Sequence, residues 1–451
     1  MSQALYGPDG FFVAGAGPAG HFRTSVHASP AFAAALLRLV AEVDSALGHP
    51  SRLDVVDVGA GRGELLLALR RLLASEDAVG LAVGVSGEPA HSGRVAVGVS
   101  GEPTHSGRSG LIPAWAGSPE TLTPTTAVRQ SPGERSSITA RSLAERVRFT
   151  AVELAPRPDD LPEEIHWTAE IPGEITGVLL ATEWLDNVPL DVALHTTGGW
   201  RYVLVEPESG VETIGGPVDP ADLDWLTTWW PGPASPRGAD RAVTGGSTST
   251  DATGGSESGL RAARPAQGSS LTARSRPGCP ETPQRDQPNP HSNRAEIGRP
   301  RDEAWAHAVG RISRGLAVAV DYGHLRDGRP VDGTLTGYRG GRQVPPVPDG
   351  SSDVTAHVAM DSVASAGAAV ARCAYSLVSQ AEALRALGAD GGRPPLSLAG
   401  TDPVGYVRAL AAASAVAELT DPAGLGGHWW LRQPVGIADV VQSSPTSSER
   451  R

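Results

Sequence analysis

The chain of 451 residues contains no lysine, so all 38 of its basic residues are arginine. A P-loop nucleotide site is therefore excluded, because its phosphate contacts need a lysine. Only two cysteines are present, Cys279 and Cys373, and they lie 94 positions apart. This spacing excludes a disulfide framework and a cysteine-based zinc site, and we expect no metal centre. So few cysteines fit the reducing cytoplasm, where we expect the protein to act.

Positive charge and long apolar runs are also scarce. The 50 acidic residues outnumber the basic ones, and the net charge of −12 argues against binding to nucleic acid. No apolar run approaches the roughly 18 residues of a membrane span, and Met1–Pro8 lacks the regions of a signal peptide. We therefore expect neither nucleic acid nor membrane as a partner.

Glycine and proline are abundant, and they are concentrated in two stretches, residues 75–140 and 231–300. The first stretch contains a 13-residue segment, 82–94, that recurs at 96–108 with one difference, and the second has no Phe, Tyr or Trp. Such compositions cannot bury enough apolar area to offset the entropy of ordering the chain. We predict two disordered insertions and a disordered tail, 440–451, within a single domain that spans residues 1–451.

The remaining 315 residues alternate between strand and helix patterns. Continuous apolar runs at Gly177–Ala181 and Leu316–Val320 are typical of parallel strands that are buried on both faces. Further predicted strands are Leu53–Val58, Val147–Leu154, Trp200–Glu206 (an edge or antiparallel strand) and His428–Arg432, and predicted helices are Ala31–Leu47, Glu64–Leu73 and parts of Met360–Leu387 and Pro403–Leu419. This alternation predicts an α/β fold with a doubly wound, mostly parallel sheet.

Three glycines follow the first predicted strand, in Asp57-Val-Gly59-Ala-Gly61-Arg-Gly63. Glycines let the backbone approach a ligand closely, and the N-terminus of the next helix presents free N–H groups. The pattern resembles the first motif of S-adenosylmethionine-dependent methyltransferases. The alternative is an ordinary tight turn.

An acid that accepts the ribose hydroxyls is expected at the end of the next strand, about 20 residues on. Glu153 ends a predicted strand 90 residues after Gly63, and the distance becomes 24 once the 66-residue insertion is discounted. We therefore predict that Glu153 binds the ribose. The alternative is a solvated strand end.

A series of segments, in order along the chain, carries a family resemblance. They are Leu5-Tyr-Gly-Pro-Asp-Gly-Phe-Phe12, Gly20-His-Phe-Arg-Thr-Ser25, the glycine turn, Glu183-Trp-Leu-Asp-Asn-Val-Pro189, Asp321-Tyr-Gly323, Gly333-Thr-Leu-Thr-Gly-Tyr-Arg-Gly340, Asp353-Val-Thr-Ala-His-Val358 and Leu419-Thr-Asp-Pro-Ala-Gly-Leu-Gly426. On these motifs the chain resembles the MidA-like methyltransferases, which include the mitochondrial complex I assembly arginine methyltransferase. The resemblance implies a seven-strand, Rossmann-like methyltransferase fold with extra helices, and S-adenosylmethionine as methyl donor. Where the family has Asn before the Glu of its N-E-x-x-D-x-x-P loop, this chain has Thr182.

Three acids are predicted to be catalytic. Glu183 and Asp186 follow one buried strand and Asp321 ends another, so all three should lie at the carboxyl edge of the sheet, where α/β proteins bind ligands. A carboxylate pair can orient a guanidinium group through two-point hydrogen bonds, although Asp186 could instead cap the following segment. The predicted cofactor-binding residues are Thr24, Ser25, Asp57, Gly59, Gly61, Gly63 and Glu153, with Thr24 and Ser25 at the methionine end unless Ser25 serves a turn.

The leading functional prediction is a cytoplasmic S-adenosylmethionine-dependent methyltransferase that acts on a cationic protein side chain, with arginine suggested by the resemblance. One alternative is a small-molecule methyltransferase, and another is a cofactor-binding assembly factor without turnover. The acidic loop around Glu183 favours a cationic substrate, whereas Thr182 favours a changed or missing one.

Overall fold

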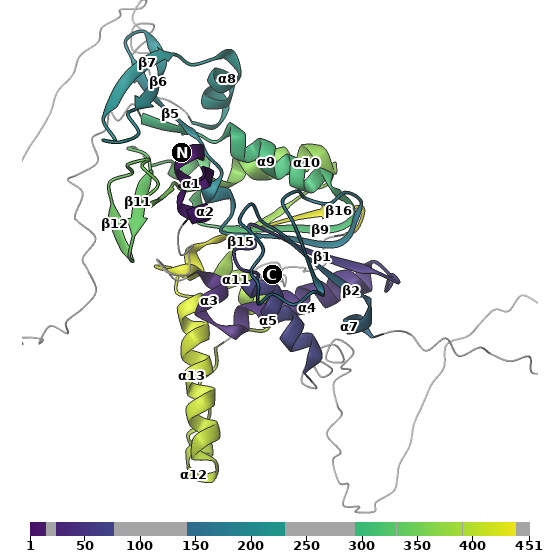
Figure 1. The fold of residues 1–451 in the computed structure, drawn as a ribbon. Coiled ribbons are helices and arrows are strands. Elements are labelled where there is room, and N and C mark those ends of the chain that lie inside the picture. The colour runs from purple at the N-terminus through teal and green to yellow at the C-terminus, as the bar shows by residue number, and fades with distance from the viewer. Residues whose placement is uncertain (15–23, 76–141, 231–293, 331, 390, 439–451) are drawn as a thin grey trace, which may run out of the picture.

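The computed structural model describes residues 1–14, 24–75, 142–230, 294–330, 332–389 and 391–438 (Figure 1). Its centre is a seven-stranded sheet with the order β15-β16-β9-β4-β1-β2-β3. The strands are β1 Leu53–Val58, β2 Val147–Val152, β3 Ile165–Thr168, β4 Ile175–Thr182, β9 Ile312–Asp321, β15 Ser376–Ser379 and β16 Trp429–Val435. Neighbours from β9 to β3 pair in parallel, and β16 is antiparallel to both of its neighbours. The predicted α/β fold with a mostly parallel sheet is confirmed.

The central strands supply two apolar cores, one on each face of the sheet. Successive side chains of a strand point to opposite faces, so Val178 and Leu180 of β4 enter one core while Leu179 and Ala181 enter the other. Helices α4 (Pro30–Ala46) and α5 (Glu64–Ala74) cover the first face, and α9 (Arg299–Gly310) and α10 (Met360–Ala371) cover the second. Burial on both faces explains why these strands are continuous apolar runs.

Helix α4 shows how local sequence sets an element boundary. The side chain of Ser29 accepts a hydrogen bond from the main-chain N–H of Ala31 at 3.1 Å, and Pro30 occupies the first helical position. A hydroxyl at the cap satisfies a free N–H group, and proline loses nothing there because its missing N–H would be unpaired. The predicted helix Ala31–Leu47 is present and begins one residue earlier, at Pro30.

Smaller sheets and helices surround the central layer (Figure 1). A four-stranded antiparallel sheet has the order β7-β6-β5-β8, a three-stranded sheet has the order β12-β11-β13, and β10 pairs with β14. Their strands are β5 Asp191–Thr196, β6 Gly199–Val205, β7 Glu212–Pro217, β8 Arg294–Ile297, β10 Gly323–His324, β11 Thr336–Arg339, β12 Arg342–Val344, β13 Asp353–Thr355 and β14 Val358–Ala359. The further helices are α1 Ser2–Tyr6, α2 Phe11–Ala14, α3 Ser25–Ala28, α7 Leu143–Arg146, α8 Pro220–Trp229, α11 Gln380–Ala386, α12 Leu396–Thr401 and α13 Pro403–Leu419.

Some predicted boundaries need correction. The second insertion was placed at 231–300, but residues 294–297 form β8, which pairs with β5, and α9 begins at Arg299. The four-residue strand is too short to outweigh the composition around it, although Ala295 and Ile297 are fully buried. Strand β15 was missed for the same reason. Residues 76–140, 231–293 and the predicted tail 440–451 lie outside the described residues, as does Cys279.

The predicted strand at Trp200–Glu206 is β6, and it is antiparallel as expected. It lies inside the separate four-stranded sheet, because its neighbours β5 and β7 closely precede and follow it along the chain. Within the described ranges, no helix combines the length and apolar character needed to cross a bilayer.

Candidate functional site

The glycine turn after β1 adopts a conformation that other residues tolerate poorly. The φ angles of Gly59, Gly61 and Gly63 are +73°, +57° and +83°, all in the left-handed region. A Cβ on Gly59 would lie 2.8 Å from Cδ1 of Trp184, and one on Gly63 would lie 2.8 Å from Cδ1 of Leu161. The turn therefore depends on glycine, and α5 begins directly after it.

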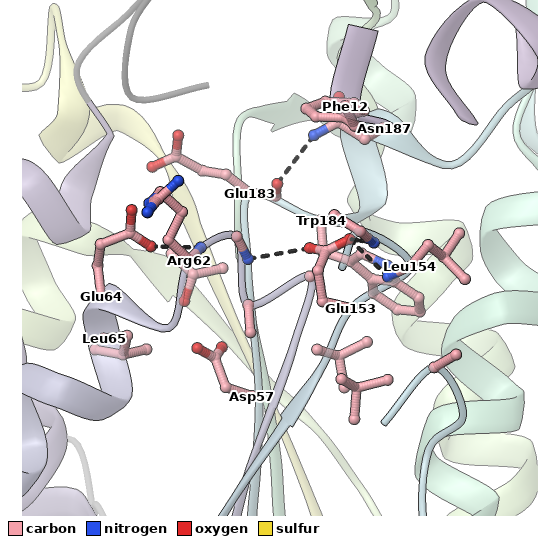
Figure 2. Close-up of a pocket in the computed structure, with 18 of the residues that line it drawn as sticks. Phe12, Asp57, Arg62, Glu64, Leu65, Glu153, Leu154, Glu183, Trp184 and Asn187 are labelled. Carbon is pink, nitrogen blue, oxygen red and sulfur yellow. Dashed lines mark hydrogen bonds between the residues drawn. The ribbon is translucent and has the colours of Figure 1, made fainter. Parts of the chain in front are cut away.

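A cavity of about 720 Å³ opens at this turn, at the carboxyl edge of the central sheet (Figure 2). Seven of the predicted site residues line it: Thr24, Asp57, Gly59, Gly61, Glu153, Glu183 and Asp186. Ser25, Gly63 and Asp321 do not. The structure thus brings most of the predicted cofactor-binding residues, and two of the three predicted catalytic acids, to one cavity.

The side chain of Glu153 is fixed against the glycine turn. Its Oε2 accepts a hydrogen bond from the main-chain N–H of Gly61 at 3.0 Å, and its Oε1 accepts from Leu154 and Ala155 at 2.7 and 3.2 Å (Figure 2). Each carboxylate oxygen has room for about two hydrogen bonds, so Oε2 can accept one more. A held acceptor beside the turn is what binding of ribose hydroxyls requires, and that role of Glu153 stays a prediction.

The cavity is acidic. Among the described residues that line it, two are arginines and six are acids, namely Asp57, Glu64, Glu153, Glu170, Glu183 and Asp186. Burial, together with the charges of Glu64 and Glu153, raises the pKa of Asp57 to about 8. An excess of carboxylates disfavours a phosphate-bearing ligand and suits a cationic one.

The loop that follows β4 holds Glu183 in an unusual backbone conformation. Its φ is +52°, and its N–H donates to the carbonyl of Val320 at 2.8 Å. A non-glycine residue pays roughly 1 kcal/mol or more for this conformation, which persists only where the surroundings enforce it. Its Oε1 accepts from the main-chain N–H of Ser25 at 2.8 Å, and Asn187 Nδ2 donates to its carbonyl at 3.2 Å. Burial raises the pKa of Glu183 to about 7, although the Ser25 N–H opposes the shift.

Asp186 lies at the cavity wall and is almost completely buried. Its Oδ2 accepts hydrogen bonds from the hydroxyls of Tyr322 and, at 3.0 Å, Thr355. Its Oδ1 is buried and has no hydrogen-bond partner among the described residues. Burial raises the pKa of Asp186, while the hydrogen bond from Tyr322 and the charge of Arg301 oppose the shift.

Asp321 holds the loop after β4 in place. It is fully buried, and its Oδ2 accepts from the main-chain N–H groups of Leu185 at 2.9 Å and Asp186 at 3.3 Å. Arg301, also buried, donates to the carbonyls of Asp186 at 2.5 Å and Val188 at 3.1 Å. These contacts are those of a residue that positions the loop. The expectation that Asp321 acts at the reacting atoms stays a prediction.

Thr24 and Ser25 have different surroundings. Thr24 lines the cavity, and its Oγ1 lies 2.7 Å from Nδ1 of His27. Ser25 is fully buried, and its hydroxyl lies 3.3 Å from Oε1 of Gln380. Its main-chain N–H holds Glu183, so the structure gives Ser25 a supporting place, and its contact with the cofactor stays a prediction.

Several lining residues were not predicted. Tyr6 and Phe12 come from the N-terminal helices, Trp184 from the loop after β4, and Glu170 and Ile171 from the segment after β3. Trp184 follows Glu183 directly and could have been found from that neighbour. The short strand β3 gave no apolar run to mark the place of Glu170. No group of side chains suited to a metal ion occurs in the described part of the chain.

Comparison with known proteins identifies the family. Residues 134–377, more than half of the chain, match the family model described as "Putative S-adenosyl-L-methionine-dependent methyltransferase". No match was found among curated proteins.

Two solved structures share the fold, and both are COG1565 superfamily proteins from Burkholderia thailandensis. One is bound to S-adenosyl-homocysteine and is 18% identical, with a TM-score of 0.58 over 98% of this chain and 88% of that chain. The other is 19% identical, with a TM-score of 0.52 over 98% of this chain and 87% of that chain.

These matches confirm the fold, the family and the cofactor that the motifs predicted. The chain belongs to this family of S-adenosyl-L-methionine-dependent methyltransferases.

Proposed function

We propose that the protein transfers the methyl group of S-adenosylmethionine to a cationic protein side chain, with arginine as the first candidate. The observation that carries the proposal is the acidic wall of the cavity, to which Glu183 and Asp186 contribute from the loop after β4. Carboxylates at a cavity wall bind cationic N–H donors through charge-assisted hydrogen bonds.

The residues around the glycine turn fit the cofactor. Gly59 and Gly61 leave the backbone open where a Cβ would intrude, Glu153 offers an acceptor for the ribose, and Leu154 and Ile171 give an apolar wall suited to a flat base. The acidic lining suits a sulfonium, which is positively charged. When bound, S-adenosylmethionine supplies a methyl group that is already activated for in-line displacement.

The protein's own groups then have three tasks: to orient the acceptor, to exclude water and to take up a proton. Glu183 and Asp186 can accept a guanidinium through charge-assisted hydrogen bonds. Glu183, with a pKa of about 7, is suited to receive the proton that the acceptor nitrogen loses, because a general base works best near the ambient pH. Trp184 packs against Gly59 of the glycine turn.

One observation favours each of the two alternative functions, a small-molecule methyltransferase and a cofactor-binding assembly factor. Thr182 in place of the family's Asn is consistent with a different acceptor, such as a small molecule. The hydrogen bonds from the hydroxyls of Tyr322 and Thr355 to Oδ2 of Asp186 are consistent with a structural role, as in a cofactor-binding assembly factor. The scarcity of cysteine supports the cytoplasm as its place of action.

The test is methyl transfer from labelled S-adenosylmethionine in a lysate of the host. The proposal predicts label in the protein fraction, recovered as methylarginine after acid hydrolysis, and none with Glu183→Gln. Label in the small-molecule fraction would support the first alternative. Binding of S-adenosylhomocysteine without any labelling would support the second.

A further inference from the structure

The N-terminal motif from Leu5 to Phe12 has a physical explanation in the structure. Leu5 and Phe11 are buried and form a small core with Val354 of β13. A Cβ on Gly7 would lie 2.5 Å from the carbonyl oxygen of Gln3, and one on Gly10 would lie 2.7 Å from that of Leu5. The two glycines therefore permit the tight path that brings α1 against α2.

This path leaves Tyr6 and Phe12 at the cavity. Both residues line it, and their rings are stacked, with centroids 5.5 Å apart and planes at 25°. The Tyr6 hydroxyl donates to the carbonyl of Asn187 at 3.2 Å, which ties the pair to the loop that carries Glu183 and Asp186. Figure 2 shows Phe12 beside Asn187, with Asp57 at the opposite end of the view. The hydrogen bond from Tyr6 thus places the pair next to the loop that carries Glu183 and Asp186.

An aromatic face carries a negative potential and attracts cations that lie over it. The two stacked rings and the side chains of Glu183 and Asp186 line the same cavity. We propose that Tyr6 and Phe12 form an acceptor wall, and that this wall holds a flat cationic side chain against Glu183 and Asp186. The inference rests on the proposed function and makes both residues determinants of acceptor specificity.

The wall predicts a split between two kinds of binding. Cation–π contacts are worth roughly 0.5–2 kcal/mol, which corresponds to about a 2- to 30-fold change in affinity. Phe12→Leu keeps apolar volume and removes the ring face, so it should weaken acceptor binding by that factor and leave S-adenosylhomocysteine affinity within about twofold. Tyr6→Phe should have a smaller effect, because it loses only the bond to Asn187. Phe149→Leu is the matched control, since Phe149 is buried in β2 and does not line the cavity.

The test uses the full chain with 4-fluorophenylalanine in place of its five phenylalanines. The fluorine signal of Phe12 is assigned from Phe12→Leu and followed with S-adenosylhomocysteine present, during titration with agmatine or with the neutral analogue butylurea. We expect agmatine to shift this signal, with at least tenfold higher apparent affinity than butylurea. We also expect agmatine binding to weaken in Tyr6→Leu and to persist in Phe149→Leu.

The outcomes separate this inference from the proposed function. No shift with agmatine, or equal affinity for butylurea, would refute the acceptor wall. A Phe12→Leu protein that loses S-adenosylhomocysteine affinity would assign the rings to the cofactor and refute it as well. A shift with agmatine in a protein that labels nothing in the lysate would support the wall and contradict the proposed catalysis.

Discussion

The place of Asp321 beneath the loop gives a prediction that separates support from chemistry. Its Oδ2 accepts two hydrogen bonds, from the main-chain N–H groups of Leu185 and Asp186. Replacement by alanine leaves both donors buried without an acceptor, at roughly 1–3 kcal/mol each, or about 2–6 kcal/mol together. Part of this cost is offset, because burial disfavours the charged carboxylate of Asp321 and raises its pKa, and alanine removes that group. Asp321→Asn keeps an acceptor oxygen for both donors, so we expect it to cost about 1 kcal/mol or less.

Turnover should follow the same order. We expect Asp321→Asn to keep methyl transfer within about fivefold of the wild type, because the loop stays in place. Asp321→Ala should lower it by about 100-fold, since a misplacement near 1 Å has that effect. Both variants should bind S-adenosylhomocysteine, because the glycine turn is untouched. The assays are thermal unfolding, calorimetry and label transfer. An Asp321→Asn protein that is stable and binds cofactor but is as inactive as Asp321→Ala would show that the charge of Asp321 takes part in the reaction.

Four further predictions follow from the site and the fold. Gly61→Val should abolish binding of S-adenosylhomocysteine in calorimetry while the protein stays folded, because φ is +57° at that position; unchanged affinity would move the cofactor elsewhere. Glu153→Ala should weaken the same binding by roughly 1–3 kcal/mol, and no change would place the ribose away from this acid. Turnover should rise with pH through about 7, because ionised Glu183 is the active form. Stability should fall as the pH rises from about 4.5, the ordinary pKa, to about 7, because the folded state holds the proton more tightly, and Glu183→Gln should flatten this dependence of thermal unfolding. Removal of residues 76–140 and 231–293 through short Gly/Ser linkers should leave cofactor affinity within about twofold, since loop-closure cost grows only with the logarithm of length, and a deleted protein that cannot bind cofactor would contradict this.

The sequence was sufficient wherever a local pattern decides the structure. The apolar run at Leu316–Val320 predicts a central strand because only a strand covered on both faces needs no polar positions. The glycine turn is equally local, since its φ angles demand glycine. Glu153 was found because an insertion changes the spacing of two strands without changing their order in the sheet.

The remainder depends on contacts between distant segments. Asp321 ends a strand as predicted, but the partners of its side chain lie on the loop after β4. No sequence pattern gives the direction of one side chain. Tyr6 and Phe12 lie more than 170 positions before Glu183 and reach the cavity only because Leu5 and Phe11 pack on β13. Strand β8 is four residues long; it pairs with β5, and its Ala295 and Ile297 are buried in one cluster with Trp225 and Leu226 of α8.

A crystal structure of the protein with S-adenosylhomocysteine is the most direct test of the central claim. The account predicts one molecule in the cavity, with its ribose hydroxyls within hydrogen-bonding distance of Glu153, its chain along Gly59 and Gly61, and its sulfur facing Glu183 and Asp186. A molecule bound outside the cavity, or one whose sulfur faces away from these two acids, would contradict it.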